Sequence, residues 1–243
     1  MKNLILILLS GWFMNLQTPD PYRILDKIDE NMISSTKILD GQMIVYGRRN
    51  TRTIRFKSFS EGTNKSFTEY LSPAREKGTK MLKLTDNLWI YTPSADRTIQ
   101  LSGHMLKQSV MGSDMSYEDM MEDRKMRDVY NAKIVGEEKI EERDCQVLEL
   151  NAKVEDVAYE KMKIWVDKQR FVPLKEELYA KSGQLLKKVV FTDVKKFGNR
   201  WYPTKINYKD MLKNGKGTDF IVDNIQFDAK IENYMFTKAV LKK

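Results

Sequence analysis

The chain has only one cysteine and one histidine among 243 residues, and this scarcity excludes several classes of protein. Cys145 alone cannot form an intramolecular disulfide or a cysteine-based metal site, so we expect it to be a core residue of a strand. The sequence also lacks a metal-binding histidine pair, a phosphate-binding glycine loop and a dinucleotide glycine pattern. We therefore expect no cofactor and no metal site.

Groups that could carry catalysis are equally scarce. His104 follows Ser102 and Gly103, a context typical of an exposed loop histidine rather than a catalytic base. Asp114, Glu118 and Asp119 could form a carboxylate cluster. A helix capped by Ser113 or Asp114, with acidic residues in its first turns, accounts for them without any further partner. The sequence therefore predicts that the protein is not an enzyme, and a lipid hydrolase would have to depend on His104.

Long apolar runs are absent except at the start, where Lys2 precedes the run from Leu4 to Leu9. This run is shorter than the roughly 20 residues that a membrane-spanning helix needs, and it is typical of a secretory signal peptide. We assign residues 1–16 to this signal, with cleavage near Leu16. The alternatives are an uncleaved inner-membrane anchor and a buried N-terminal strand or helix.

The positive charge is not concentrated. The chain has 42 basic and 34 acidic residues, and its basic clusters alternate with apolar or acidic residues, as on the solvated face of a sheet. A basic stripe interleaved with aromatic residues, which nucleic-acid binding requires, is missing, so we expect no nucleic-acid partner. Attraction to anionic lipid head groups accounts for the positive surface better than nucleic-acid binding does.

Apolar spacing predicts one helix followed by many strands. Residues 21–33 have helical spacing after Asp20 and Pro21, whereas from Gly41 the period is two. The predicted strands are 41–48, 52–59, 65–71, 80–85, 87–92, 97–101, 132–140, 144–152, 158–166, 170–180, 185–195, 200–211 and 217–228. About a dozen strands with short turns predict a mainly β protein, a curved, incompletely closed antiparallel β-barrel. We expect residues 17–243 to form one domain.

A sheet with one apolar face must cover its concave side. The candidates are the N-terminal helix, a helix near residues 114–126 and the segment Ile231–Leu241. The second candidate is rich in methionine, with residues 105, 111, 115, 120, 121 and 126 all of this type. Methionine is unbranched and polarizable, so this cluster predicts a soft apolar surface that adapts to ligands of varied shape.

Three segments closely resemble the outer-membrane lipoprotein-sorting family, the LolA-like group. They are Leu71-Ser72-Pro73-Ala74-Arg75-Glu76-Lys77-Gly78-Thr79, Leu88-Trp89-Ile90-Tyr91-Thr92-Pro93 and Met111-Gly112-Ser113-Asp114-Met115-Ser116-Tyr117-Glu118-Asp119. The resemblance covers nearly the whole mature chain, including Ile164-Trp165-Val166-Asp167-Lys168, Pro173-Leu174-Lys175-Glu176-Glu177 and Arg200-Trp201-Tyr202-Pro203-Thr204-Lys205. The chain departs from the family at two positions, where Met115 and Val110 replace phenylalanine.

The resemblance implies a periplasmic protein whose half-barrel holds an apolar cavity under helices. It implies a carrier that takes acyl chains of lipoproteins or other lipid from an inner-membrane transporter and passes them to an outer-membrane acceptor. The alternative is an envelope lipid sensor of the same fold that binds a signalling protein. A carrier would work as a monomer, and each buried methylene would contribute about 0.8 kcal/mol to binding.

From the resemblance and the apolar pattern we expect nine residues to contact the ligand. They are Ile44, Tyr46, Trp89, Tyr91, Leu106, Met111, Met115, Met120 and Met121. We expect Arg75 to hold the lid through hydrogen bonds to backbone carbonyls, a role similar to that of a basic residue in the carriers.

Overall fold

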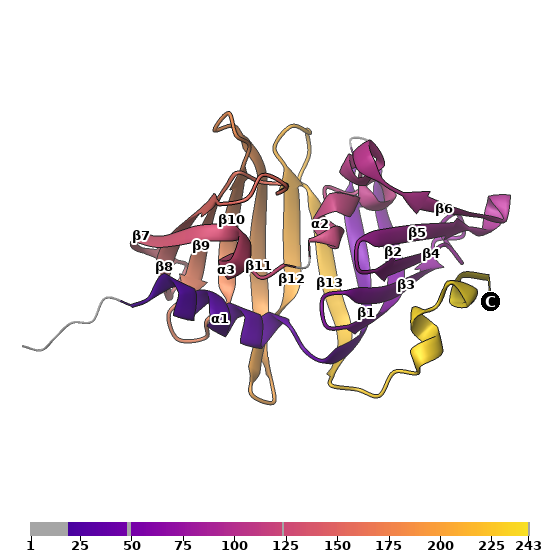
Figure 1. Ribbon diagram of the computed structural model, residues 1–243, viewed down its shortest axis with the longest axis horizontal. Coiled ribbons are helices and arrows are strands. Elements are labelled where there is room, and N and C mark those ends of the chain that lie inside the picture. Colours follow the sequence, from indigo (N-terminus) through magenta and orange to yellow (C-terminus); the bar gives the residue numbers. More distant parts are fainter. Residues whose placement is uncertain (1–18, 48–49, 123, 243) are drawn as a thin grey trace, which may run out of the picture.

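The computed structural model describes residues 19–47, 50–122 and 124–242, and its main feature is one antiparallel sheet of thirteen strands (Figure 1). The strands are β1 Thr36–Tyr46, β2 Thr51–Glu61, β3 Lys65–Ser72, β4 Lys80–Leu84, β5 Asn87–Thr92, β6 Arg97–Leu101, β7 Tyr130–Ile140, β8 Arg143–Ala152, β9 Lys161–Asp167, β10 Pro173–Tyr179, β11 Leu185–Phe197, β12 Arg200–Asp210 and β13 Thr218–Phe227. The predicted signal peptide lies outside the described residues. Within the described ranges, no helix combines the length and the apolar character that crossing a membrane requires.

The fold class is confirmed, and each predicted range overlaps one of the thirteen strands, although β1 begins at Thr36, five residues before its predicted start, and β9 begins three residues after its own. The strand order is β6-β5-β4-β3-β2-β1-β13-β12-β11-β10-β9-β8-β7, so the first and last strands pair in the middle and β6 and β7 form the two edges. The sheet is therefore curved but not closed. The segment between β6 and β7 runs from one edge to the other.

The predicted N-terminal helix is also confirmed, as α1 Pro21–Met32. The Asp20 side chain caps it by accepting a hydrogen bond from the Tyr22 backbone N–H at 3.0 Å, and Pro21 occupies the first turn, where its missing N–H costs nothing. Ile24, Leu25 and Ile28 are buried against β7, β8 and β9. The apolar stripe thus fixes α1 on one face of the sheet.

Alternation along the strands divides the sheet into two faces. On the inner face, Leu88 and Ile90 pack with the segment that follows β6, and Ile164 packs under α1. Trp89 and Trp165 point to the opposite, outer face. Cys145 is fully buried in β8 on the outer side, as expected for a core residue.

The C-terminal segment does not cover the concave side, which corrects our expectation. Its two 3-10 helices, Asn233–Phe236 and Lys238–Lys242, place Val240 and Leu241 against Phe67, Leu82 and Trp89 on the outer face. The strands β3, β4 and β5, which carry Phe67, Leu82 and Trp89, have apolar residues on both faces because both faces of the sheet are covered there.

The predicted helix near 114–126 is replaced by two short helices, α2 Tyr117–Met121 and α3 Met126–Val129. The helix α2 begins after Ser116 rather than after Ser113 or Asp114. Ser116 Oγ accepts from the Asp119 N–H at 3.2 Å, and Asp119 Oδ2 accepts from the Ser116 N–H at 2.7 Å. This reciprocal pair is a capping box, so Asp119 has the local role expected of an acid in the first turn.

Candidate functional site

A cavity of about 380 Å³ lies between the inner face of β1–β4 and residues 103–122, which we call the lid. Its apolar lining residues come from strands and lid together: Leu39, Met43, Phe56, Tyr70, Val110, Met115, Met120 and Phe220. The volume is at the lower end of the 300–1,000 Å³ typical of small-molecule sites. The chemistry of this part of the site is therefore burial of apolar ligand surface.

The lid contains a tight turn beside the cavity. The Val110 N–H donates to the Met115 carbonyl at 2.8 Å, and Met111 and Gly112 both have positive φ, at 49° and 73°. A Cβ atom at Gly112 would also lie 3.1 Å from a terminal nitrogen of Arg52. Glycine at 112 thus permits both the left-handed backbone and the close approach of the arginine.

Arg52, at the start of β2, holds this turn on one side. Its guanidinium donates to the Met111 carbonyl at 2.7 Å and to Glu76 Oε1 at 2.8 Å. Glu76 is only 6% exposed, so the arginine also neutralises a carboxylate that is largely removed from solvent.

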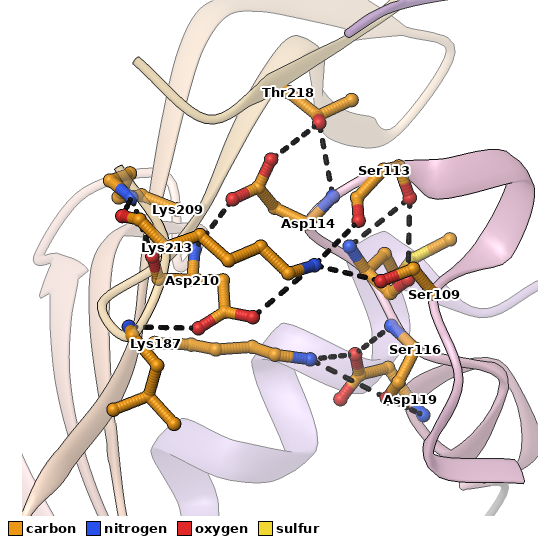
Figure 2. A network of polar contacts seen from close by, with 12 residues as sticks. Ser109, Ser113, Asp114, Ser116, Asp119, Lys187, Lys209, Asp210, Lys213 and Thr218 are labelled. Atoms are coloured by element: carbon orange, nitrogen blue, oxygen red, sulfur yellow. Dashed lines mark hydrogen bonds and ion pairs between the residues drawn. The ribbon is translucent and has the colours of Figure 1, made fainter. Parts of the chain in front are cut away.

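Polar contacts with β11–β13 hold the lid on its other side (Figure 2). Asp114 accepts from Thr218 Oγ1 at 2.8 Å and from the Asp210 N–H at 3.0 Å. Lys213 Nζ donates to the Ser113 carbonyl at 3.0 Å and to Ser109 Oγ at 2.7 Å. These contacts join segments about 100 residues apart in the sequence, so the position of the lid depends on the completed sheet.

One buried ion pair extends this network. Lys187 on β11 pairs with Asp119 of the capping box, and both side chains are about 10% exposed. The Tyr159 hydroxyl donates to the other oxygen of Asp119 at 2.5 Å. Burial, and then the charge of Asp119, raise the pKa of Tyr159, so this hydroxyl stays a donor over the whole physiological range.

Five of the nine expected contact residues belong to the lid and pack against the inner-face cluster: Leu106, Met111, Met115, Met120 and Met121. Met115 and Met120 line the cavity directly. His104 also lies in the lid, within the 3-10 helix Gly103–Lys107, and its side chain is exposed.

The other four expected residues lie on the outer face, which is a correction. Trp89 and Tyr91 pack with the C-terminal segment. Ile44 alternates with the inward-facing Met43 and Val45, and the Tyr46 hydroxyl donates to Asp219 at 3.0 Å. The physical reason is the two-residue repeat of a strand. Successive side chains point to opposite faces, so a prediction that is displaced by one residue places a side chain on the wrong face.

Arg75 does not make the contact expected of it. Its side chain is 87% exposed, and its ion pair among the described residues is a long one to Glu76, at 3.9 Å. Arg52 makes the hydrogen bond to the lid carbonyl instead. Sequence reasoning missed Arg52, Phe56 and Tyr70, although the alternation of Ile54 and Phe56 with polar residues in β2 was a usable signal for their face.

The carboxylate of Glu176 lies on the inner face in the half of the sheet that α1 covers. It pairs across the strands with Ile164 on one side and Val189 on the other, and it forms no hydrogen bond or ion pair with a described residue. Burial raises the pKa of Glu176 to about 7. The inner face is therefore apolar at Glu176 too, in the part of the sheet that lies away from the lid, and it disfavours an unpaired charge there.

This raised pKa predicts a pH-dependent stability. An acid with a higher pKa in the folded state destabilises the fold once it ionises, so the loss grows as pH rises from 4.5 towards 7 and is complete above 7. We expect Glu176→Gln to raise the free energy of unfolding by about 2 kcal/mol at pH 8 and to change it little at pH 4. Urea unfolding at both pH values measures this. An equal effect at the two values would contradict it.

The comparisons with known proteins agree with this geometry. A family model described only as "Uncharacterized protein" matches residues 62–243. No curated protein matches the chain. A putative outer membrane lipoprotein-sorting protein domain from Vibrio parahaemolyticus is 25% identical, with a TM-score of 0.80, and the match covers 92% of this chain and 100% of that one.

Two further solved structures share the fold over 92% of this chain and 100% of their own. A LolA superfamily protein from Nitrosomonas europaea is 26% identical, with a TM-score of 0.75. A DUF1329 family protein from Desulfovibrio piger is 24% identical, with a TM-score of 0.82, and supports the fold alone. The chain belongs to the family whose model matches residues 62–243, and its structural neighbours include LolA superfamily and outer membrane lipoprotein-sorting domain proteins, the group that its sequence motifs resemble.

Proposed function

We propose that the protein is a periplasmic carrier that binds acyl chains of lipoproteins or other lipid and passes them from the inner to the outer membrane. The observation that carries this proposal is the cavity of about 380 Å³ between apolar strands and a methionine-rich lid. Each methylene that enters would contribute about 0.8 kcal/mol, so part of a chain is enough for binding. The protein acts by binding rather than by catalysis.

The lid contacts support a cycle of opening and closing. Hydrogen bonds and ion pairs from Arg52, Lys187 and Lys213 hold the lid at its polar rim, whereas Met115 and Met120 line the cavity. Polar contacts of this kind can exchange with water or with a partner protein at little net cost. The donor would be an inner-membrane transporter and the acceptor an outer-membrane protein or the membrane itself.

The direct test is mass spectrometry of ligand that copurifies with the protein from the periplasm. We expect acyl-containing molecules at a stoichiometry that approaches one per chain, because a buried apolar ligand dissociates slowly. A transfer assay between donor and acceptor vesicles then separates the carrier from the sensor, since a sensor would bind lipid and transfer none. Absence of acyl ligand from protein expressed in a membrane-containing host would contradict the proposal.

A further inference from the structure

The inner face of β1–β4 changes from apolar to polar along the strands. Cross-strand pairing defines rows of neighbouring side chains, and Met43 pairs with Ile54 in the row near the Met111–Gly112 turn. The row nearest the β2–β3 turn is polar and consists of Lys37, Ser60, Ser66 and Lys83 in spatial order.

All four residues of this polar row line the cavity. Met43 lies six positions after Lys37 along β1, which corresponds to roughly 20 Å of strand. The cavity is therefore elongated, with an apolar end and a polar end, and the exposed Gly62 of the β2–β3 turn lines it at the polar end.

The polar end carries positive charge. Lys37 forms no ion pair with a described residue, and its ammonium lies 5.4 Å from the centre of the Tyr202 ring. Lys83 is 4% exposed and donates to the Met121 carbonyl at 3.0 Å. Glu122 also lines the cavity and pairs with Arg124 at 2.8 Å, so we assign the positive charge that a ligand would meet at this end to Lys37.

We propose that the cavity holds a single acyl chain whose anionic head group, a carboxylate or a phosphate, lies among Lys37, Ser60 and Ser66. This inference rests on the proposed function and narrows its ligand. One ammonium group and two hydroxyls supply hydrogen-bond donors of the kind that such a head group requires. A volume of about 380 Å³ favours one chain over several.

The test compares three ligands with the same palmitoyl chain: palmitate, palmitoyl lysophosphatidic acid and uncharged monopalmitoylglycerol. Each displaces a neutral naphthylamine probe from the full-length mature protein. We expect the two anions to bind about tenfold more tightly than the neutral ligand, and this advantage to shrink as salt increases. The difference in affinity between palmitate and palmitoyl lysophosphatidic acid shows whether the site prefers a carboxylate or a phosphate head group.

Substitutions then locate the effect. Lys37→Gln is expected to reduce the anion advantage to less than about twofold and to leave binding of the neutral ligand unchanged. Lys57→Gln is the matched control, because Lys57 lies on the outer face of β2 and pairs with Asp40 at 3.3 Å. A Ser60→Ala, Ser66→Ala double variant keeps the test independent of how well Lys37→Gln folds, and we expect it to weaken anion binding selectively.

The outcomes separate the inference from the proposed function. Equal affinity for neutral and anionic ligands, or equal behaviour of Lys37→Gln and Lys57→Gln, would overturn the head-group assignment and leave lipid binding intact. Failure of all three ligands to displace the probe would overturn both.

Discussion

A Met115→Asp, Met120→Asp double variant is expected to lose binding of a fluorescent fatty-acid probe by more than about 100-fold. Both methionines line the cavity from the lid side. A carboxylate at either position must be desolvated when an acyl chain binds, or it must keep the lid away from the strands. Both outcomes remove the apolar surface on which binding depends. Probe titration measures the loss directly.

The matched control places the same two charges on the surface. Met211 and Leu212 are 39% and 64% exposed in the turn after β12, so Met211→Asp, Leu212→Asp should leave probe binding unchanged. A Met115→Ala, Met120→Ala variant separates lost apolar contact from added charge, and we expect an intermediate affinity. Unchanged probe binding by the aspartate pair would place the ligand outside this cavity.

Arg52→Gln is expected to release a bound fatty-acid probe about tenfold faster and to lower the free energy of unfolding by about 2 kcal/mol. Arg52 is the link between the Met111 carbonyl of the lid and the buried Glu76. Its loss leaves that carboxylate without its close cation and frees the turn above the cavity. Stopped-flow displacement and urea unfolding give the two values.

Arg75→Gln is the control, because Arg75 is the neighbouring arginine that sequence similarity favoured. Its side chain is 87% exposed, so its removal should change stability by less than about 0.5 kcal/mol and leave probe release unchanged. The same acceleration in both variants would contradict the assignment of the lid contact to Arg52.

The period of the sequence was enough to predict the strands but not the face that each residue occupies. Thirteen ranges with period two became thirteen strands because turn residues separate them. In β1 and β5, however, consecutive residues are apolar, as in Leu88-Trp89-Ile90-Tyr91. Both faces of β5 are buried, one by the lid and one by the C-terminal segment, so alternation carries no information about direction.

The lid was predictable in composition and less so in geometry. Its methionines predicted an adaptable apolar surface, and Leu106, Met115 and Met120 pack against the inner-face cluster. The partners that position the lid come from β2 and β11–β13, far away in the sequence. A single sequence shows which residues are charged, but the pairing of Lys187 with Asp119 depends on strand register.

The pairing of β1 with β13 has a consequence for how the protein reaches its native state. Every other neighbouring pair in the sheet joins strands that are consecutive in the sequence, whereas Lys37 and Phe227 meet across almost the whole chain. Pairing two strands that are so far apart in the sequence costs more conformational entropy than any other step in folding. The strands within each meander, β1–β6 and β7–β13, can pair locally. The pairing of β1 with β13, which joins the two meanders, should form last. An emerging polypeptide would thus hold no cargo until its final strand has docked.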